Sequence, residues 1–162
     1  GLYFFEDDFD MDTQRRNFDF YEPMTVHESS LSPCVHTILA CKLDKIEKAY
    51  EMYVRTARLD LDDYNNDTED GLHITSMAGT WMSVVKGFGG MRVKNTQLHL
   101  NPILPANWES LSFRIGLKNN LLEIGISKDG VTIKNLSETD VEISLFDKKV
   151  LINGNSEYFS VG

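Results

Sequence analysis

A change in the spacing of apolar residues near position 90 constrains the fold of this chain more than any other feature of its sequence. Before that point apolar residues recur at steps of three and four, and after it they alternate with polar residues in short runs. The first spacing lines one face of a helix, and the second lines one face of a strand. Gly87, Gly89 and Gly90 stand at the change and favour a helix end. The sequence therefore predicts an α+β protein, with a helical domain over residues 1–90 and an antiparallel β-sandwich or sheet domain over residues 91–162.

The helical half is expected to contain helices joined by short connections. Asp12 is the expected N-cap of a helix over residues 13–21. Ser32 at the cap and Pro33 at the first helical position predict a second helix, and Asp44 is the expected cap of a third. Two helices separated by so little chain form an antiparallel hairpin.

A last helix is expected over residues 74–86, before the glycines. The adjacent small residues Ala78 and Gly79 predict a close contact with another helix, because they leave room for a neighbouring backbone. Large apolar residues at helical spacing define the side that this helix is expected to bury. The residues expected on that side are Ile74, Met77, Ala78, Trp81, Val84 and Val85.

The second half predicts six to eight short strands. Turn sequences containing Asn, Asp and Gly separate runs of alternating polarity, as in antiparallel sheets. This half carries no cluster of histidines, cysteines or paired acids, so we interpret it as structural. The predicted strands cover residues 97–100, 110–116, 121–127, 131–135, 141–146, 149–152 and 157–161.

Composition excludes several classes of function. A net charge of −9 disfavours non-specific binding to nucleic acid, which requires a basic surface. No apolar run reaches the length of a membrane span, and no basic signal peptide is visible. Cys34 and Cys41 lie two helical turns apart, too far for a disulfide, which predicts a reduced, cytoplasmic protein. The chain opens on Gly1 without methionine, so we expect a processed protein or a segment of a longer one.

Two polar segments carry the candidate functional residues. Residues 22–33 include Pro23 and Pro33 and lead into a predicted helix, and residues 70–76 lead into the last predicted helix. Helix N-termini present unpaired N–H groups and the positive end of the helix dipole, which favour anions. We expect the two segments to face each other and hold an oxyanion. The expected ligands are Ser29, Ser30 and His73, with Thr25, His27, Glu28 and Ser76 behind them.

Other interpretations of these residues remain open. The serines can serve as helix caps, His73 can cap its helix, and His27 can be a satisfied loop histidine. A zinc site at His27, His36 and Glu28 lacks an HExxH or CxxC pattern, so no metal is expected. A serine nucleophile is disfavoured because no GxSxG motif is present.

At these same residues the chain resembles the disaccharide phosphorylases of glycoside hydrolase family 65. Residues 21–32, Tyr-Glu-Pro-Met-Thr-Val-His-Glu-Ser-Ser-Leu-Ser, are similar to that family's phosphate loop. Residues 70–81, Asp-Gly-Leu-His-Ile-Thr-Ser-Met-Ala-Gly-Thr-Trp, are similar to its second signature. The likeness continues through residues 89–92 and 98–105 into the predicted sheet domain.

The resemblance implies that residues 1–90 are the last helices of an (α/α)6 catalytic barrel, followed by a small C-terminal β domain over residues 91–162. It implies inverting phosphorolysis of an α-linked glucose disaccharide, with maltose expected, to β-glucose 1-phosphate and glucose. Phosphate binding maps onto Ser29, Ser30 and His73, and the partners are the disaccharide and inorganic phosphate without a cofactor. The general acid is expected upstream of this chain, which should be inactive alone, and the parent is expected to be a homodimer.

Two alternatives to phosphorolysis come from the same residues. A related α-glucoside hydrolase of the trehalase type would use water, with Glu28 as the nearest candidate base. A non-catalytic, carbohydrate-associated module would rest on the β domain. The paired serines favour the phosphorylase, since an inverting hydrolase needs a carboxylate base in place of a phosphate ligand.

Overall fold

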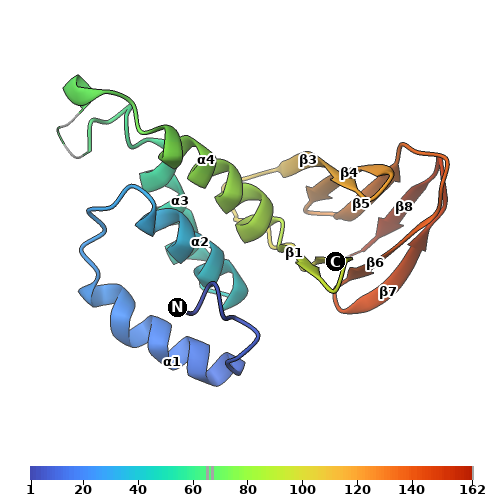
Figure 1. Ribbon diagram of the computed structural model, residues 1–162, viewed down its shortest axis with the longest axis horizontal. Helices are drawn as coiled ribbons and strands as arrows, with labels where there is room; N and C mark the ends of the chain where they lie inside the picture. Colours follow the sequence, from blue (N-terminus) through green and yellow to red (C-terminus); the bar gives the residue numbers. More distant parts are fainter. Residues whose placement is uncertain (65, 67, 162) are drawn as a thin grey trace. The chain divides into compact units, whose positions relative to one another are not determined.

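The computed structural model describes residues 1–64, 66 and 68–161, and the chain forms two compact units. The first unit covers residues 1–87 and is helical, and the second runs from Phe88 onward and is built of strands (Figure 1). The observed boundary, between residues 87 and 88, lies three residues before the boundary predicted between residues 90 and 91. The α+β class expected from the two apolar spacings is confirmed.

The helical unit contains four α-helices among the residues described. They are α1 (Met11–Tyr21), α2 (Ser32–Lys42), α3 (Ile46–Ala57) and α4 (Ile74–Met82). A π-helical turn, η3 (Ser83–Phe88), continues α4, and short 3-10 turns η1 (Glu22–Met24) and η2 (Thr68–Asp70) lie in the connections.

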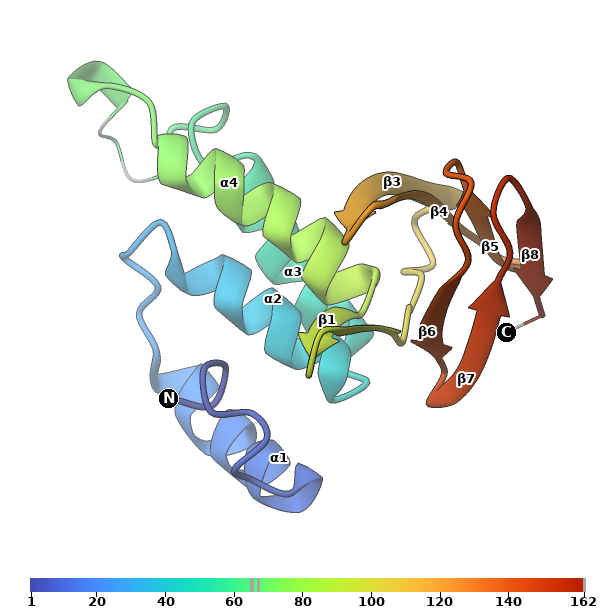
Figure 2. The same ribbon diagram turned by 45° about the vertical axis from the view of Figure 1, so that its right-hand side comes forward.

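Helix α2 forms the core of the helical unit, with α3 and α4 packed against it (Figure 2). Its buried residues lie on most of its circumference, as expected for a helix enclosed by neighbours. Gly79 of α4 makes the close contact that the sequence predicted, because a Cβ there would lie 3.1 Å from Cys34 Cβ. The buried residues of α2 are Pro33, Cys34, Thr37, Ile38, Leu39, Ala40 and Cys41.

The three predicted helix caps are each wrong by one or two residues. Asp10, rather than Asp12, caps α1, because its carboxylate accepts the N–H of Thr13 at 2.6 Å. This hydrogen bond is the main cause that lowers the pKa of Asp10. Helix α2 includes Ser32 as its first residue, so the N-cap is Leu31 without a side-chain bond, and the Ser32 hydroxyl serves another partner.

Asp44 ends α2 and does not cap α3. Its backbone lies in the left-handed region, with φ of 59°, and Lys45 N–H donates to Ala40 C=O at 2.9 Å. This is the hydrogen-bond pattern of a Schellman helix end, with Asp44 in the position where glycine is commonest. The N-cap of α3 is Lys45, which makes no side-chain capping bond.

The predicted buried side of the last helix is wrong over α4, where Ala78 is also exposed, whereas Val85 in η3 is buried as predicted. Ile74, Met77 and Trp81 are 67%, 49% and 53% exposed, whereas the small residues Ser76 and Gly79 are buried. Small side chains let α4 approach α2 and α3 closely, so its inward face is the small one. The apolar strip formed by Ile74, Met77 and Trp81 faces outward.

The second unit contains eight strands in two four-stranded sheets, within the residues described. One sheet has the order β1-β2-β6-β7 and the other β3-β4-β5-β8. The strands are β1 (Met91–Lys94), β2 (Gln97–Leu100), β3 (Ser110–Leu117), β4 (Asn120–Ser127), β5 (Gly130–Asn135), β6 (Val141–Leu145), β7 (Lys148–Ile152) and β8 (Glu157–Ser160).

Both sheets contribute apolar side chains to the core of the second unit. Leu98, Leu122, Ile124, Ile133 and Ile143 are fully buried, in line with the period-two prediction. The pairing is antiparallel as expected, except that β2 and β6 pair in parallel in the described part of the chain.

Strand β1 was not predicted, because the turn that joins it to β2 lacks glycine. Asn95 and Thr96 fill that two-residue turn with φ of 49° and 63°, values in the left-handed region. Phe146 and Asp147 do the same between β6 and β7. In both turns the two central residues have positive φ, and this turn geometry matches the twist of the flanking strands. Asn-Gly and Asp-Gly are the sequences that usually indicate such a turn.

Candidate functional site

The segment between α1 and α2 is organised around His27. This residue is 7% exposed, and its backbone lies in the left-handed region with φ of 57°. Arg55 of α3 donates from Nη2 to the His27 carbonyl at 3.0 Å, and the ring Nδ1 is 2.9 Å from Ser32 Oγ. His27 therefore ties this segment to both α2 and α3.

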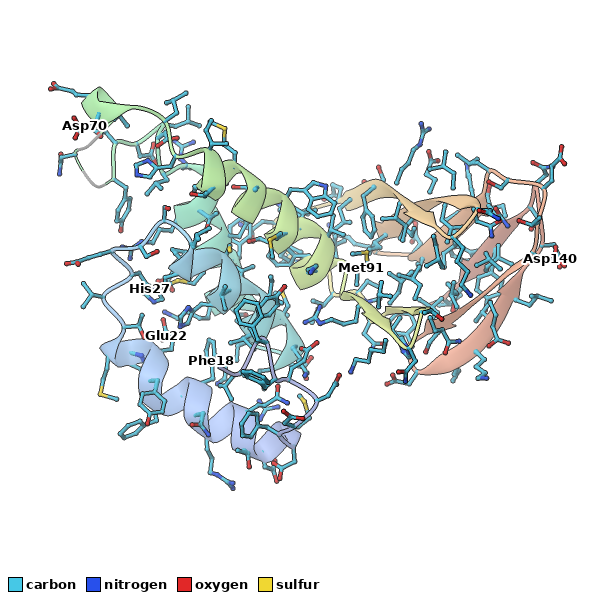
Figure 3. The ribbon with its side chains drawn as sticks, in the orientation of Figure 1. Phe18, Glu22, His27, Asp70, Met91 and Asp140 are labelled. Carbon is cyan, nitrogen blue, oxygen red and sulfur yellow. The ribbon has the colours of Figure 1, made fainter. Side chains whose placement is uncertain are left out.

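The ring of His27 is held in a mixed electrostatic environment. Its Nε2 is 3.7 Å from Glu22 Oε1, and Figure 3 shows both residues on the stretch that leads from α1 to α2. The His36 ring lies edge-on with ring centroids 4.5 Å apart. Burial is the main cause that lowers the pKa of His27, and the positive charges of His36 and Arg55 add to it. The neutral form of His27 is favoured in the folded chain.

Ser29 and Ser30 lie immediately before α2. The N–H of Leu31 donates to Ser29 Oγ at 3.4 Å, and the Ser29 side chain is exposed. Ser30 Oγ is 3.5 Å from Thr75 Oγ1, a residue in the first turn of α4. The expectation that the two polar segments face each other is confirmed by this contact across the helical unit.

His73 occupies the N-cap position of α4 and is held by Asp60. The two oxygens of the Asp60 carboxylate accept separately, one from the His73 backbone N–H at 2.9 Å and one from ring Nδ1 at 2.6 Å. Both side chains are mostly buried, with 22% of His73 and 14% of Asp60 exposed. The His73 ring is therefore fixed in direction at the start of α4.

The other predicted residues differ in what their side chains do. Ser76 is buried and donates to the Thr56 carbonyl at 3.0 Å, so its hydroxyl serves the packing of α4 on α3. Thr25 donates to the Tyr21 carbonyl at 2.8 Å at the end of α1. Glu28 is exposed on the connecting segment.

Two residues that organise the site, Arg55 and Asp60, were not predicted. Both lie outside the two polar segments, residues 22–33 and 70–76, that carry the predicted site residues. Both act across long sequence separations, 28 residues for Arg55 with His27 and 13 for Asp60 with His73. Local spacing carries no signal for such pairs.

Hydroxyls, a fixed histidine and two helix N-termini gather in this region. Such groups bind oxyanions through hydrogen bonds to charged oxygens. Within the described part of the chain, no three His, Cys, Asp or Glu side chains are arranged to hold a metal ion. Nor does any helix among these residues have the length and apolar character needed to cross a bilayer.

Family models match both units of the chain. Residues 1–82 match the glycosyl hydrolase family 65 central catalytic domain, and residues 91–152 match the C-terminal domain of the same family. The first match alone covers half of the sequence and includes all of the candidate site residues.

Relatives of known description agree with these models. The chain is 49% identical to maltose phosphorylase of Bacillus subtilis (strain 168) over 157 residues, which is 97% of this chain and 21% of that protein. It is 46% identical to alpha,alpha-trehalose phosphorylase of Thermoanaerobacter brockii over 144 residues, covering 89% of this chain and 19% of that protein. The chain thus spans about a fifth of the length of these relatives.

A solved structure shares the fold. A candidate kojibiose phosphorylase from the human microbiome superimposes with a TM-score of 0.90 at 38% sequence identity, covering 98% of this chain and 22% of that one. Together with the two family models, this similarity assigns the sequence. The chain belongs to glycosyl hydrolase family 65.

Proposed function

We propose that this chain is the phosphate-binding segment of an inverting disaccharide phosphorylase. The observation that carries the proposal is the 3.5 Å contact between Ser30 and Thr75, which brings the segment before α2 against the start of α4. Ser29, Ser30 and His73 supply donors to inorganic phosphate there. Thr25, His27, Glu28 and Ser76 are the residues that we propose to lie behind these donors, and the proposed site uses no metal or cofactor.

The reaction needs a binding site for phosphate and a separate general acid. A phosphate oxygen attacks the anomeric carbon of an α-linked glucoside while the glycosidic C–O bond breaks, which gives β-glucose 1-phosphate. A general acid protonates the departing sugar oxygen, and that residue lies outside this chain. Phosphate brings its own nucleophilic oxygen, so donors take the place of the carboxylate base of an inverting hydrolase.

Maltose is the proposed disaccharide, and glucose the second product. Support comes from the 49% identity to a maltose phosphorylase over 97% of the chain, against 46% over 89% for a trehalose phosphorylase. We further propose that the complete protein is cytoplasmic and homodimeric. The 162-residue chain alone should cleave no maltose, because it lacks the acid.

The test is maltose cleavage by the full-length protein that carries this chain, with and without inorganic phosphate. Proton NMR of the product should show β-glucose 1-phosphate, formed only when phosphate is present. Ser29→Ala combined with Ser30→Ala should raise KM for phosphate about tenfold or more, because two donors to a charged group are lost. Ser112→Ala, on an exposed position of β3, is the matched control and should leave KM unchanged.

Three outcomes would overturn the proposal. Cleavage that does not depend on phosphate would identify a hydrolase. Unchanged phosphate kinetics in the double serine variant would remove the assigned site and favour a non-catalytic role for this segment. Phosphate-dependent cleavage by the isolated chain would show that the acid lies within it.

A further inference from the structure

His73 and Asp60 form a two-point grip in the candidate site. Each carboxylate oxygen of Asp60 takes a different donor of His73, the backbone N–H at 2.9 Å and ring Nδ1 at 2.6 Å. A single bond would leave the ring able to rotate about its side-chain torsions. Two bonds from one carboxylate to backbone and ring fix both the residue and the plane of its imidazole.

This grip also determines which ring nitrogen carries a proton. An ionised carboxylate only accepts hydrogen bonds, so Nδ1 must donate. Nε2 lies across the ring from Nδ1 and is therefore the nitrogen directed away from Asp60. A carboxylate at this distance also stabilises positive charge on the ring, which lets Nε2 donate to an anion.

The second histidine of the region provides an internal comparison. His27 Nδ1 faces the Ser32 hydroxyl at 2.9 Å, and its nearest carboxylate, Glu22, is 3.7 Å from Nε2. His36 and Arg55 also face this ring and oppose positive charge on it. The surroundings of His27 thus favour a neutral, structural histidine, whereas the ring of His73 has a carboxylate oxygen 2.6 Å from Nδ1.

We propose that Asp60 is the positioning residue for His73, which it orients and charges so that Nε2 donates to inorganic phosphate. This inference rests on the proposed function for its ligand. Asp60 itself does not touch the phosphate. Its effect on phosphate binding passes through the His73 ring.

The kinetic test compares Asp60→Asn with Asp62→Asn in the full-length protein. The amide oxygen in Asp60→Asn can still accept the backbone N–H of His73, but the negative charge beside the ring is gone. We expect KM for phosphate to rise about tenfold, the effect of losing one hydrogen bond to a charged group, with KM for maltose unchanged. Asp62 is exposed and paired with Arg58 at the C-cap of α3, so its amide variant is the matched control and should keep both values.

The spectroscopic test uses the 162-residue chain labelled with 15N in its histidines. In the wild type the His73 ring shifts should report a protonated Nδ1, and adding inorganic phosphate should shift Nε2. In Asp60→Asn the Nδ1 proton should no longer be fixed, and the phosphate-induced shift should weaken. Asp62→Asn should reproduce the wild-type spectrum.

The two tests separate failure of the inference from failure of the proposed function. Phosphate-independent cleavage by the wild type would overturn the function, while the ring shifts would still report on the grip. Phosphate-dependent cleavage with equal KM values in both amide variants would overturn the inference, as would a wild-type ring protonated only at Nε2. If Asp60→Asn fails to fold, the inference is tested by the wild-type spectrum and by Asp60→Glu, which keeps the carboxylate. Asp60→Glu should then retain more phosphate binding than His73→Ala.

Discussion

His27 shows how much of this region depends on single residues. A non-glycine residue in the left-handed region costs about 1–2 kcal/mol and persists only where its surroundings hold it. Here Arg55 holds its carbonyl and Ser32 holds its ring, as described above. The strained residue stands just before Ser29 and Ser30, so its backbone sets the direction in which the proposed phosphate segment leaves α1.

Substituting His27 should separate backbone strain from side-chain bonding. His27→Ala keeps the strain and loses the Ser32 contact, so the helical unit should lose about 1–3 kcal/mol of stability. His27→Gly loses the same contact but relieves the backbone, and it should be more stable than the alanine variant by about 1 kcal/mol. Urea unfolding followed by far-ultraviolet circular dichroism measures both. Equal stability of the two variants would contradict a strained backbone at this position.

The buried ring of His27 also predicts a pH dependence of stability. Because burial lowers its pKa in the folded state, the unfolded chain binds the proton more tightly. The stability contributed by neutral His27 is therefore full above about pH 6.5, the unfolded value, and is lost as the pH falls through the folded pKa. Urea titrations from about pH 8 to about pH 5 should show this decline. His27→Asn should flatten it, and an unchanged slope in that variant would assign the decline to other groups.

At the scale of elements, the sequence was a good guide to which helices and strands form. It was a poorer guide to where they end and to which face they bury. The alternation of apolar residues located seven of the strands, since that spacing is local. Helix ends shifted because Asp10 and Asp12 are equally good caps by composition, and only the backbone geometry chooses between them. Strand β1 was missed because Asn95 and Thr96 adopt turn conformations usually assigned to glycine.

The reversed face of α4 has a different origin. Periodicity reports that a face is apolar, but it does not report what covers that face. Gly79 packs inward because a larger residue would collide with Cys34, and the strip of Ile74, Met77 and Trp81 is left outward. If the proposed barrel assignment holds, other helices of the complete protein cover this strip.

Gly79 is therefore the position where α4 should tolerate substitution least. Gly79→Val places side-chain atoms against Cys34 Cβ and Sγ, both within 3.2 Å of the added Cβ, and should destabilise the helical unit by about 1–3 kcal/mol. Ala78→Val introduces the same side chain at an exposed neighbouring position and should change stability by less than about 1 kcal/mol. Thermal unfolding of both variants measures the difference. Similar losses in the pair would show that the branched side chain itself, rather than packing, limits this helix.

At the scale of the whole molecule, each unit has its own core. Fully buried side chains such as Ile38 in the first unit and Ile124 in the second belong to separate clusters, as expected for chain segments that fold independently. The sequence located the candidate site through local signals, the hydroxyls and histidine beside predicted helix starts. It could not find Asp60 or Arg55, because both reach their partners only once α3 is packed.

The β unit should fold without the helical unit. A fragment beginning at Phe88 retains both sheets and their shared core, so we expect dispersed amide resonances and a cooperative thermal transition. An NMR spectrum of the 15N-labelled fragment, compared with the complete chain, provides the measurement. Collapsed amide dispersion near random-coil values would show that the sheets need the helices.

The outward strip of α4 contains one of the two tryptophans of the chain, and the other lies in the second unit. Trp81 is solvent-accessible, while Trp108 stacks edge-on with buried Phe88 at a centroid separation of 4.8 Å. The intrinsic fluorescence of the protein therefore combines a red-shifted, readily quenched emitter, Trp81, with a less exposed one, Trp108. Replacing either indole with phenylalanine leaves a single optical reporter for one unit, so that acrylamide quenching can follow the helices and the sheets separately without an added dye.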